Sequence, residues 1–140
     1  MCEPLTLIFL QYSLTYSNYL LISIMFDFEN LEVYKKAKSL NSLVYSSIIV
    51  SGTLDTVIKN QLRRASLSIV LNIAEGTSRF SKPDRRNFCI IARGSIFECV
   101  AIFDILKDDN KLTQDQFTYL YGQYEEISKM LFAMIKNMER

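Results

Sequence analysis

The sequence predicts an all-α protein, an antiparallel up-down-up-down four-helix bundle, and three observations support this prediction. Only four glycines and two prolines interrupt 140 residues, of which 49% are hydrophobic; so few helix breakers favour long regular elements. Apolar residues recur every three or four positions over four segments of about twenty residues. Short polar links separate these segments, so consecutive helices are expected to fold back on one another. A chain of this length forms one domain around a single core.

The first predicted helix covers residues 31–50, with Asn30 as its N-cap. Its apolar face follows the helical spacing and consists of Val33, Ala37, Leu40, Val44 and Ile48. Ser51 and Gly52 are expected to end it.

The second and third predicted helices cover residues 54–74 and 82–107. Gly76 is expected to end the second in a left-handed conformation, and its apolar stripe is Ile58, Leu62, Ala65, Ile69 and Ile73. After a short polar link, Ser81 caps the third helix and Pro83 fits its first turn. The inner side of the third helix is predicted to carry Phe88, Ile91, Ser95, Ile102 and Ile105.

The fourth predicted helix begins after residues 108–110, which break the apolar pattern. Thr113 is followed three residues later by Gln116, and this pair is typical of a capping box. The stripe that continues to the C-terminus is Phe117, Leu120, Tyr124, Ile127, Leu131 and Met134 or Ile135.

Residues 1–24 differ from the rest, because Glu3 is the only charge before Asp27. A signal peptide is disfavoured, since the basic start is missing. A membrane span is possible by length, with the following lysines on the inner side, but polar residues in its middle are costly in hydrocarbon: Gln11, Ser13, Thr15, Ser17 and Asn18. We favour a third interpretation, in which Met25 is the natural start and residues 1–24 are loosely packed upstream sequence. Residues 25–140 then form the bundle domain.

Residue types that catalysis or metal binding usually needs are scarce. The chain has no histidine, which removes the commonest general base and metal ligand. Cys2, Cys89 and Cys99 are an odd number without close spacing, so neither a disulfide framework nor a zinc site is indicated. Cys89 and Cys99 are interpreted as reduced, apolar helix fillers of a cytoplasmic protein. We expect no enzyme activity, cofactor, metal or membrane partner.

A polar stripe adjoins the apolar faces of the second and third predicted helices. Its members are Gln61, Arg64, Ser68, Asn72, Glu75, Gly76, Gly94, Ser95 and Glu98. Half-buried polar groups cost about 1–3 kcal/mol each without a partner. We therefore interpret the stripe as a structural network that fixes the register of the two helices. A catalytic or ligand site is the disfavoured alternative, because no nucleophile lies beside a base.

The antiparallel arrangement predicts specific partners within this network. Arg64 is expected to meet Glu98, within the subunit or across a subunit boundary. Asn72 and Glu75 are expected to approach two arginines early in the third helix, Arg85 and Arg86. The small size of Gly94 and Ser95 is expected to let the two helix backbones approach closely.

Several motifs carry a resemblance to a known family. They are Gln-Leu-Arg-Arg-Ala-Ser-Leu-Ser-Ile (61–69), Asn-Ile-Ala-Glu-Gly (72–76), Ile-Ala-Arg-Gly-Ser (91–95) followed by Glu98, and the opening 28–37. Together they resemble the four-helix bundle proteins encoded in intervening sequences of bacterial large-subunit ribosomal RNA genes. The resemblance covers about residues 26–136 and leaves out residues 1–24. Two departures are the short link at 51–55, where members usually carry a proline, and Val-Leu at 70–71.

The resemblance implies a ring of subunits, expected to be a homopentamer, and no enzymatic activity. Relatives also serve as nucleic-acid-binding accessories of retroelements. Independently, aromatic residues such as Tyr119, Tyr121 and Phe132 exceed what the surface of a lone monomer needs, and this also favours a homo-oligomer.

The charge distribution indicates a phosphate-binding surface. Between Lys59 and Arg93, eight basic residues stand against two acidic ones, a net +6 in a chain of net +1, whereas residues 94–140 carry a net −3. Such asymmetry suits structured RNA or DNA, and a ring would repeat it. The candidate binding residues are Lys59, Arg63, Arg79, Lys82, Arg85, Arg86 and Arg93. The open alternative is an oligomeric scaffold in which an acidic neighbour uses the same arginines. No aromatic-interleaved basic motif of a single-strand reader is visible.

Overall fold

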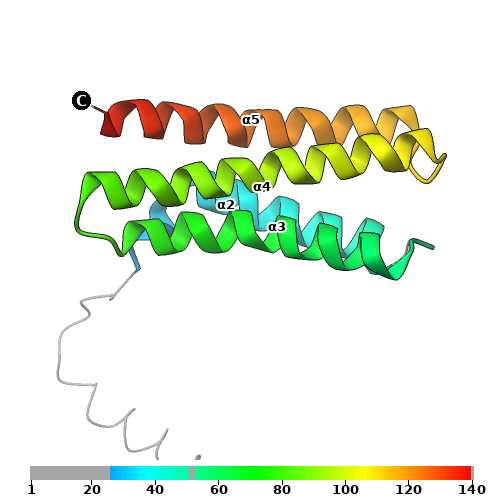
Figure 1. The fold of residues 1–140 in the computed structure, drawn as a ribbon, viewed down its shortest axis with the longest axis horizontal. Helices are drawn as coiled ribbons and strands as arrows, with labels where there is room; N and C mark the ends of the chain where they lie inside the picture. Colours follow the sequence, from blue (N-terminus) through cyan, green and yellow to red (C-terminus); the bar gives the residue numbers. More distant parts are fainter. Residues whose placement is uncertain (1–25, 51–52, 140) are drawn as a thin grey trace, which may run out of the picture.

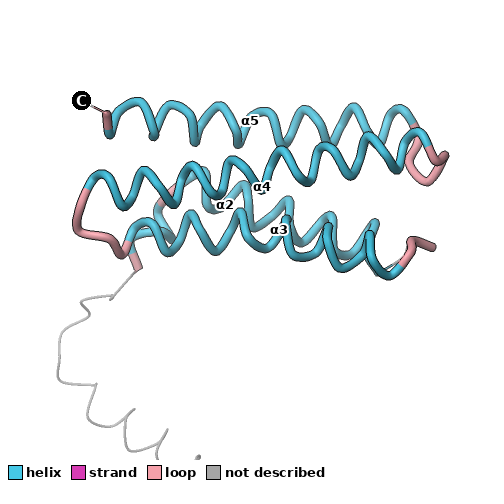
Figure 2. The backbone as a smooth tube through the Cα atoms, viewed as in Figure 1, coloured by secondary structure: helices cyan, strands magenta, loops and turns pink. Residues whose placement is uncertain are grey.

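The computed structural model describes residues 26–50 and 53–139, and this part of the chain is all-α, with four long helices and no strand (Figure 2). A 3₁₀ turn, η2 (Asp27–Asn30), precedes the first long helix, and a π-helical segment, η3 (Tyr45–Val50), follows it. The long helices are α2 (Glu32–Val44), α3 (Thr56–Thr77), α4 (Lys82–Asp108) and α5 (Gln114–Met138). The extension predicted at residues 1–24 lies outside the described residues.

Each long helix packs against two others, so that α2 and α4 each contact both α3 and α5. Figure 1 shows α4 lying between α3 and α5, with the α3–α4 turn and the C-terminus at the same end of the bundle. Later residues of α3 contact earlier residues of α4, as in an antiparallel pair. Ser68 bonds Ser95, whereas Gly76, farther along α3, lies against Phe88, nearer the start of α4. This packing is compatible with the antiparallel up-down-up-down arrangement that the sequence predicts.

The start of α2 differs from the prediction, because Asn30 does not cap it. Asn30 belongs to η2, where the Glu29 carboxylate accepts a 3.0 Å hydrogen bond from the Phe26 backbone N–H. Leu31 is the N-cap and offers no side-chain hydrogen bond. The predicted apolar face is nevertheless buried, and the π-helical segment adds Ile49 to it.

Helix α3 begins where Asp55 accepts a 2.7 Å hydrogen bond from the Val57 N–H, two residues after the predicted start. The predicted left-handed Gly76 is wrong, because Gly76 lies inside α3 and no described glycine has a positive φ. A Cβ atom at this position would lie 3.1 Å from the Cβ of Phe88. Gly76 therefore serves the close approach of α3 to α4 rather than a turn.

Helix α4 has the predicted cap but presents a different inner face. Ser81 accepts from the Asp84 N–H, and Pro83 lies in the first turn. Ile91 and Ile105, which were predicted inside, are about half exposed. The buried residues are instead Cys89, Ala92, Ser95, Ile96, Cys99, Ile102, Phe103 and Leu106. Because α4 is apolar on almost every side, periodicity alone does not identify the face toward the core.

Helix α5 matches its prediction. Thr113 and Gln116 form a reciprocal capping box, with hydrogen bonds of 2.9 and 3.2 Å. Leu120, Tyr124, Ile127, Leu131 and Ile135 are buried along the predicted stripe. Before α5, Asn110 adopts a left-handed φ of 55°, which ends the helical path of α4.

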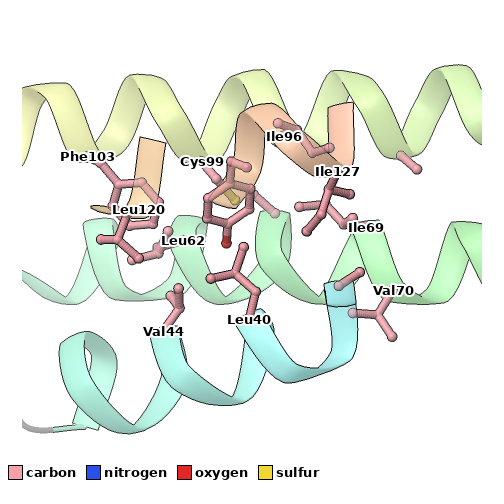
Figure 3. Close-up of a cluster of buried hydrophobic side chains, with 14 of the residues drawn as sticks. Leu40, Val44, Leu62, Ile69, Val70, Ile96, Cys99, Phe103, Leu120 and Ile127 are labelled. Carbon is pink, nitrogen blue, oxygen red and sulfur yellow. The ribbon is translucent and has the colours of Figure 1, made fainter. Parts of the chain in front are cut away.

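The core holds a chain of polar groups that the sequence did not reveal. Ser66 donates to the Asn41 side-chain oxygen at 2.9 Å and lies 3.4 Å from the Tyr124 hydroxyl. Tyr124 and Cys99 are buried in the same core cluster, and Cys99 lies among leucine and isoleucine side chains (Figure 3). Burial raises the pKa of Cys99 to about 12, and burial likewise raises the pKa of Tyr124. Both groups are therefore protonated in the folded protein at neutral pH.

Alkaline pH is expected to destabilise the fold through Cys99. The thiol has an ordinary pKa of 9.0, so above that pH the unfolded chain loses this proton while the folded chain keeps it up to about 12. In that interval the free energy of unfolding falls by about 1.4 kcal/mol per pH unit. Urea denaturation between about pH 8 and about pH 10 should show that the free energy of unfolding falls more steeply with pH for the parent than for Cys99→Ala. Equal losses in the two proteins would contradict the assignment.

Candidate nucleic-acid interface

The structure separates the seven predicted binding residues into different regions. Lys59 and Arg63 lie in the first turns of α3, whereas Arg79 follows its C-terminal end. Twenty residues of helix at 1.5 Å each place Lys59 about 30 Å from Arg79. Arg93 lies midway along α4. The basic stretch is therefore not one patch. Its largest group, here called the basic turn, consists of Arg79, Lys82, Arg85 and Arg86.

Two arginines of the basic turn form ion pairs with carboxylates. Arg79 pairs with Glu75 one turn earlier on α3. Arg86 pairs with Glu139 at 2.9 Å and so joins the start of α4 to the end of α5. Hydrogen bonds from Lys136 and then from Arg86 lower the pKa of Glu139. These side chains remain partly exposed, so the pairs contribute little to stability and salt screens them.

The other two cations of the basic turn have their charge free for a partner. Arg85 donates one hydrogen bond, from Nε to the Arg79 backbone oxygen at 2.5 Å, and its side chain is exposed. Lys82 is exposed and has no hydrogen bond or ion pair within the described chain. Arg79 also lies 4.7 Å above the ring of Phe88, which fixes the loop against α4.

An exposed aromatic residue lies inside this turn and was missed by sequence reasoning. Phe80 has a relative exposure of 101%. The exposed aromatics that were predicted, Tyr119, Tyr121 and Phe132, are also about half exposed. Its exposure could have been predicted from the sequence, because Phe80 stands in a polar link with no apolar residue beside it to pack against.

Two of the remaining basic residues are engaged within the subunit. The guanidinium of Arg63 lies 5.5 Å from the centre of the Tyr45 ring. Arg93 donates to Ser128 at 3.1 Å and lies over two aromatic rings of α4 and α5, at 5.3 and 5.2 Å. Such contacts hold the side chains along the bundle surface, and this makes Arg63 and Arg93 weaker candidates for phosphate binding.

Part of the predicted polar network forms between α3 and α4. Ser68 and Ser95 are joined by a 2.9 Å hydrogen bond between their hydroxyls. Asn72 donates from its side chain to the Ser68 carbonyl at 2.8 Å and to the Ser68 hydroxyl at 3.0 Å. Ser95 also bonds the Ile91 carbonyl at 3.2 Å. The Ser68–Ser95 bond joins α3 to α4, and Asn72 holds the Ser68 side chain from within α3.

The rest of the predicted network is not assembled within the subunit. Gln61, Arg64 and Glu98 are exposed, and the described residues provide no hydrogen bond or ion pair for them. In the described residues Asn72 and Glu75 make no hydrogen bond or ion pair with Arg85 or Arg86: Asn72 bonds its own helix and Glu75 pairs with Arg79. Gln61, Arg64, Glu75 and Glu98 are exposed to solvent, whereas Asn72 is half-buried.

The outer side of α4 carries a row of exposed apolar or small residues. We call it the α4 seam: Ile90, Gly94, Phe97, Ala101 and Ile105, all exposed. Phe97 is 61% exposed and Ile105 is 50% exposed. A Cβ atom at Gly94 would meet nothing within 4 Å, so the predicted role of Gly94 in α3–α4 packing is wrong. Intervals of three and four residues place the seam along one line of the helix.

A groove of about 450 Å³ runs beside the seam, between α4 and α5. Its walls are largely apolar, with Phe97, Phe117 and Tyr121 among them, and Asp104 and Glu125 add two carboxylates. No group of three or more metal-ligating side chains occurs in the described residues. Among the helices described, none is both long and apolar enough to span a membrane.

Comparisons with known proteins agree with the fold. No curated protein matches the sequence. A crystal structure of a protein with unknown function from the S23 ribosomal protein family of Bacteroides thetaiotaomicron has a similar fold, with a TM-score of 0.70 and 24% sequence identity, over 74% of this chain and 98% of that chain. The family model described as 23S rRNA-intervening sequence protein matches residues 29–133, which is most of the bundle. The chain therefore belongs to the 23S rRNA-intervening sequence protein family.

Proposed function

We propose that this protein is a non-enzymatic homo-oligomer of antiparallel up-down-up-down bundles that binds structured RNA or DNA. The observation that carries the proposal is the basic turn, in which four cations gather on one short loop and the first turn of α4. The family description names 23S rRNA, and this supports an RNA partner over other polyanions.

The chemistry of the basic turn suits a phosphate backbone. Lys82 and Arg85 are exposed, so neither must leave a buried site to reach a phosphate. The exposed carboxylates that pair with Arg79 and Arg86 are weak competitors, because a phosphate accepts the same bidentate hydrogen bonds and carries its own charge. Contacts of this kind position a nucleic acid without reading its sequence.

The α4 seam supports the oligomer. Five exposed positions on one line of α4 are apolar or small, and an apolar helix face of this kind is normally covered. Gly94 and Ala101 leave room for the close approach of another helix. We propose a second copy of the chain as the occupant, with five subunits expected from the family resemblance. Arg64 and Glu98, which have no partner inside the subunit, are then available to pair across the boundary.

An oligomer strengthens the nucleic-acid function. Each subunit contributes one basic turn at the same end of its bundle, so a ring would present several at fixed spacing. Contacts of modest individual affinity then add up on one long polyanion.

The alternative function is an oligomeric scaffold without nucleic acid. It is favoured by one observation, namely that Arg79 and Arg86 already have carboxylate partners. In that case the free cations Lys82 and Arg85 would meet an acidic neighbour, such as the groove that contains Asp104 and Glu125.

Mass and binding measured on the same sample test the proposal. Sedimentation at micromolar concentration is expected to give the mass of several chains. Retention of a labelled, structured RNA is expected to fall steeply as salt rises, because each neutralised phosphate releases counterions. A single-chain mass contradicts the oligomer. Absence of salt-dependent retention of any nucleic acid contradicts the binding function.

A further inference from the structure

We infer that Phe80 is a stacking platform for an unpaired base of the nucleic acid held at the basic turn, which makes the ligand a strand with an end, bulge or loop rather than a plain duplex. This inference rests on the proposed function. Its first support is exposure: at 101% relative exposure, Phe80 has no contact that would explain an aromatic ring at this position. A benzyl side chain left in water forgoes the free energy that its burial would contribute.

The backbone on both sides of Phe80 is fixed, so the ring is presented by an ordered loop. Before it, the Ser78 N–H bonds the Glu75 carbonyl at 3.1 Å and the Arg79 N–H bonds the Gly76 carbonyl at 3.2 Å. After it, the Ser81 hydroxyl caps α4. The loop backbone therefore loses little conformational freedom on binding, and preorganisation of this kind favours affinity.

The surroundings of Phe80 identify the occupant. Its neighbours in the loop and the first turn of α4 are polar or cationic, namely Ser78, Arg79, Ser81 and Lys82. The α4 seam, by contrast, is a continuous apolar row. A single flat ring among cations does not match an apolar protein surface, but it does match a nucleotide. The base offers a π face to the ring, and its phosphates meet Lys82 and Arg85.

Stacking on Phe80 would require a base that has left its helix. A base inside a duplex has both faces covered by its neighbours, so a ring outside the duplex reaches only a terminal or unstacked base. Bulges, loops and ends of RNA supply such bases. The cations of the basic turn contact phosphates whether or not the strand is paired, so the two contributions are separable by experiment.

The experiment uses the full chain and two fluorescent RNA probes. The first, called the blunt duplex, is a short duplex whose two ends are closed by non-nucleotide linkers, so that no terminal base face is exposed. The second is the same duplex with one linker replaced by a single-stranded 3′ overhang. Phe80→Ala is expected to weaken binding of the overhang probe by about 5- to 150-fold and to leave binding of the blunt duplex nearly unchanged. Phe80→Trp should retain the affinity for the overhang. Phe80→Leu, which keeps apolar bulk without a π face, should lose it as Phe80→Ala does. Tyr119→Ala removes an exposed aromatic at the other end of the bundle and serves as the control.

A spectroscopic signal ties the effect to stacking. A 2-aminopurine base in the overhang should be quenched on binding to the parent but not to Phe80→Ala, and a chain without tryptophan leaves this signal clear. Equal weakening of both probes by Phe80→Ala, no weakening, or a Phe80→Leu variant as tight as the parent would overturn the inference. So would a Phe80→Ala variant with reduced oligomer mass, because the ring would then belong to a subunit interface. Failure of the parent to bind either probe would instead reject the proposed function itself.

Discussion

Replacing Arg79, Lys82, Arg85 and Arg86 together by glutamine is expected to abolish binding of structured RNA and duplex DNA while the oligomer stays intact. Each cation that neutralises a phosphate contributes about −0.9 to the slope of log affinity against log salt on duplex DNA. Removing four such contacts from every subunit should therefore weaken binding by orders of magnitude at physiological salt. Glutamine keeps a long polar side chain, so the loop loses charge rather than bulk.

A variant of equal charge separates local contacts from net charge. Glutamine at Lys35, Lys38, Lys111 and Lys129 also removes four exposed cations, but none lies in the basic turn. Retention of a labelled RNA by this control should stay close to that of the parent, whereas the turn variant should lose it. Binding by the turn variant as tight as that of the parent would rule out the basic turn. A turn variant that sediments as single chains would assign these arginines to an interface and favour the scaffold function.

A carboxylate on the α4 seam is expected to separate the oligomer into folded single chains. Phe97 is 61% exposed in the subunit, so Phe97→Glu places its charge in water there and leaves the core intact. The guanidinium of Arg93 lies 5.3 Å from the ring and would accommodate the new charge. In the covered seam the same carboxylate would be buried without a partner in the second copy, at a cost of several kcal/mol per interface.

Sedimentation of Phe97→Glu beside Ser39→Glu tests this expectation. Ser39 is an exposed residue of α2, the helix that does not contact α4, so a carboxylate there should leave the mass of the oligomer unchanged. Far-ultraviolet circular dichroism should show equal helix content in both variants. An oligomer that survives Phe97→Glu would show that the seam is not the contact between copies. A parent that already sediments as one chain would rule out the homo-oligomer altogether.

Several local features of this protein were determined by its sequence alone. The caps at Ser81 and Thr113 lie where they were predicted, because a capping hydrogen bond depends on residues at most three positions apart. The buried stripe of α5 was also predicted correctly, since most residues on its other sides are polar. The family motifs could be identified without coordinates for the same reason, because they are short and contiguous.

The orientation of α4 was decided only by the tertiary structure. Apolar residues occur on almost every side of α4, so its periodicity allows several faces toward the core. The packing of α3 and α5 selects the face that contains Cys99. Ile91 and Ile105 are consequently outside, and Gly94 lies on an open seam. Gly76 could be recognised as a contact point rather than a turn only once Phe88 was placed against it.

The candidate site shows the same division. The sequence determined that the cations between Lys59 and Arg93 are abundant, but their number says nothing about their spacing. The rigid length of α3 separates them into groups about 30 Å apart. Ion pairs and cation–π contacts then engage several of them within the subunit. The full exposure of Phe80 is also a tertiary property, because it depends on which helices pass near the turn, and none of the described ones covers it.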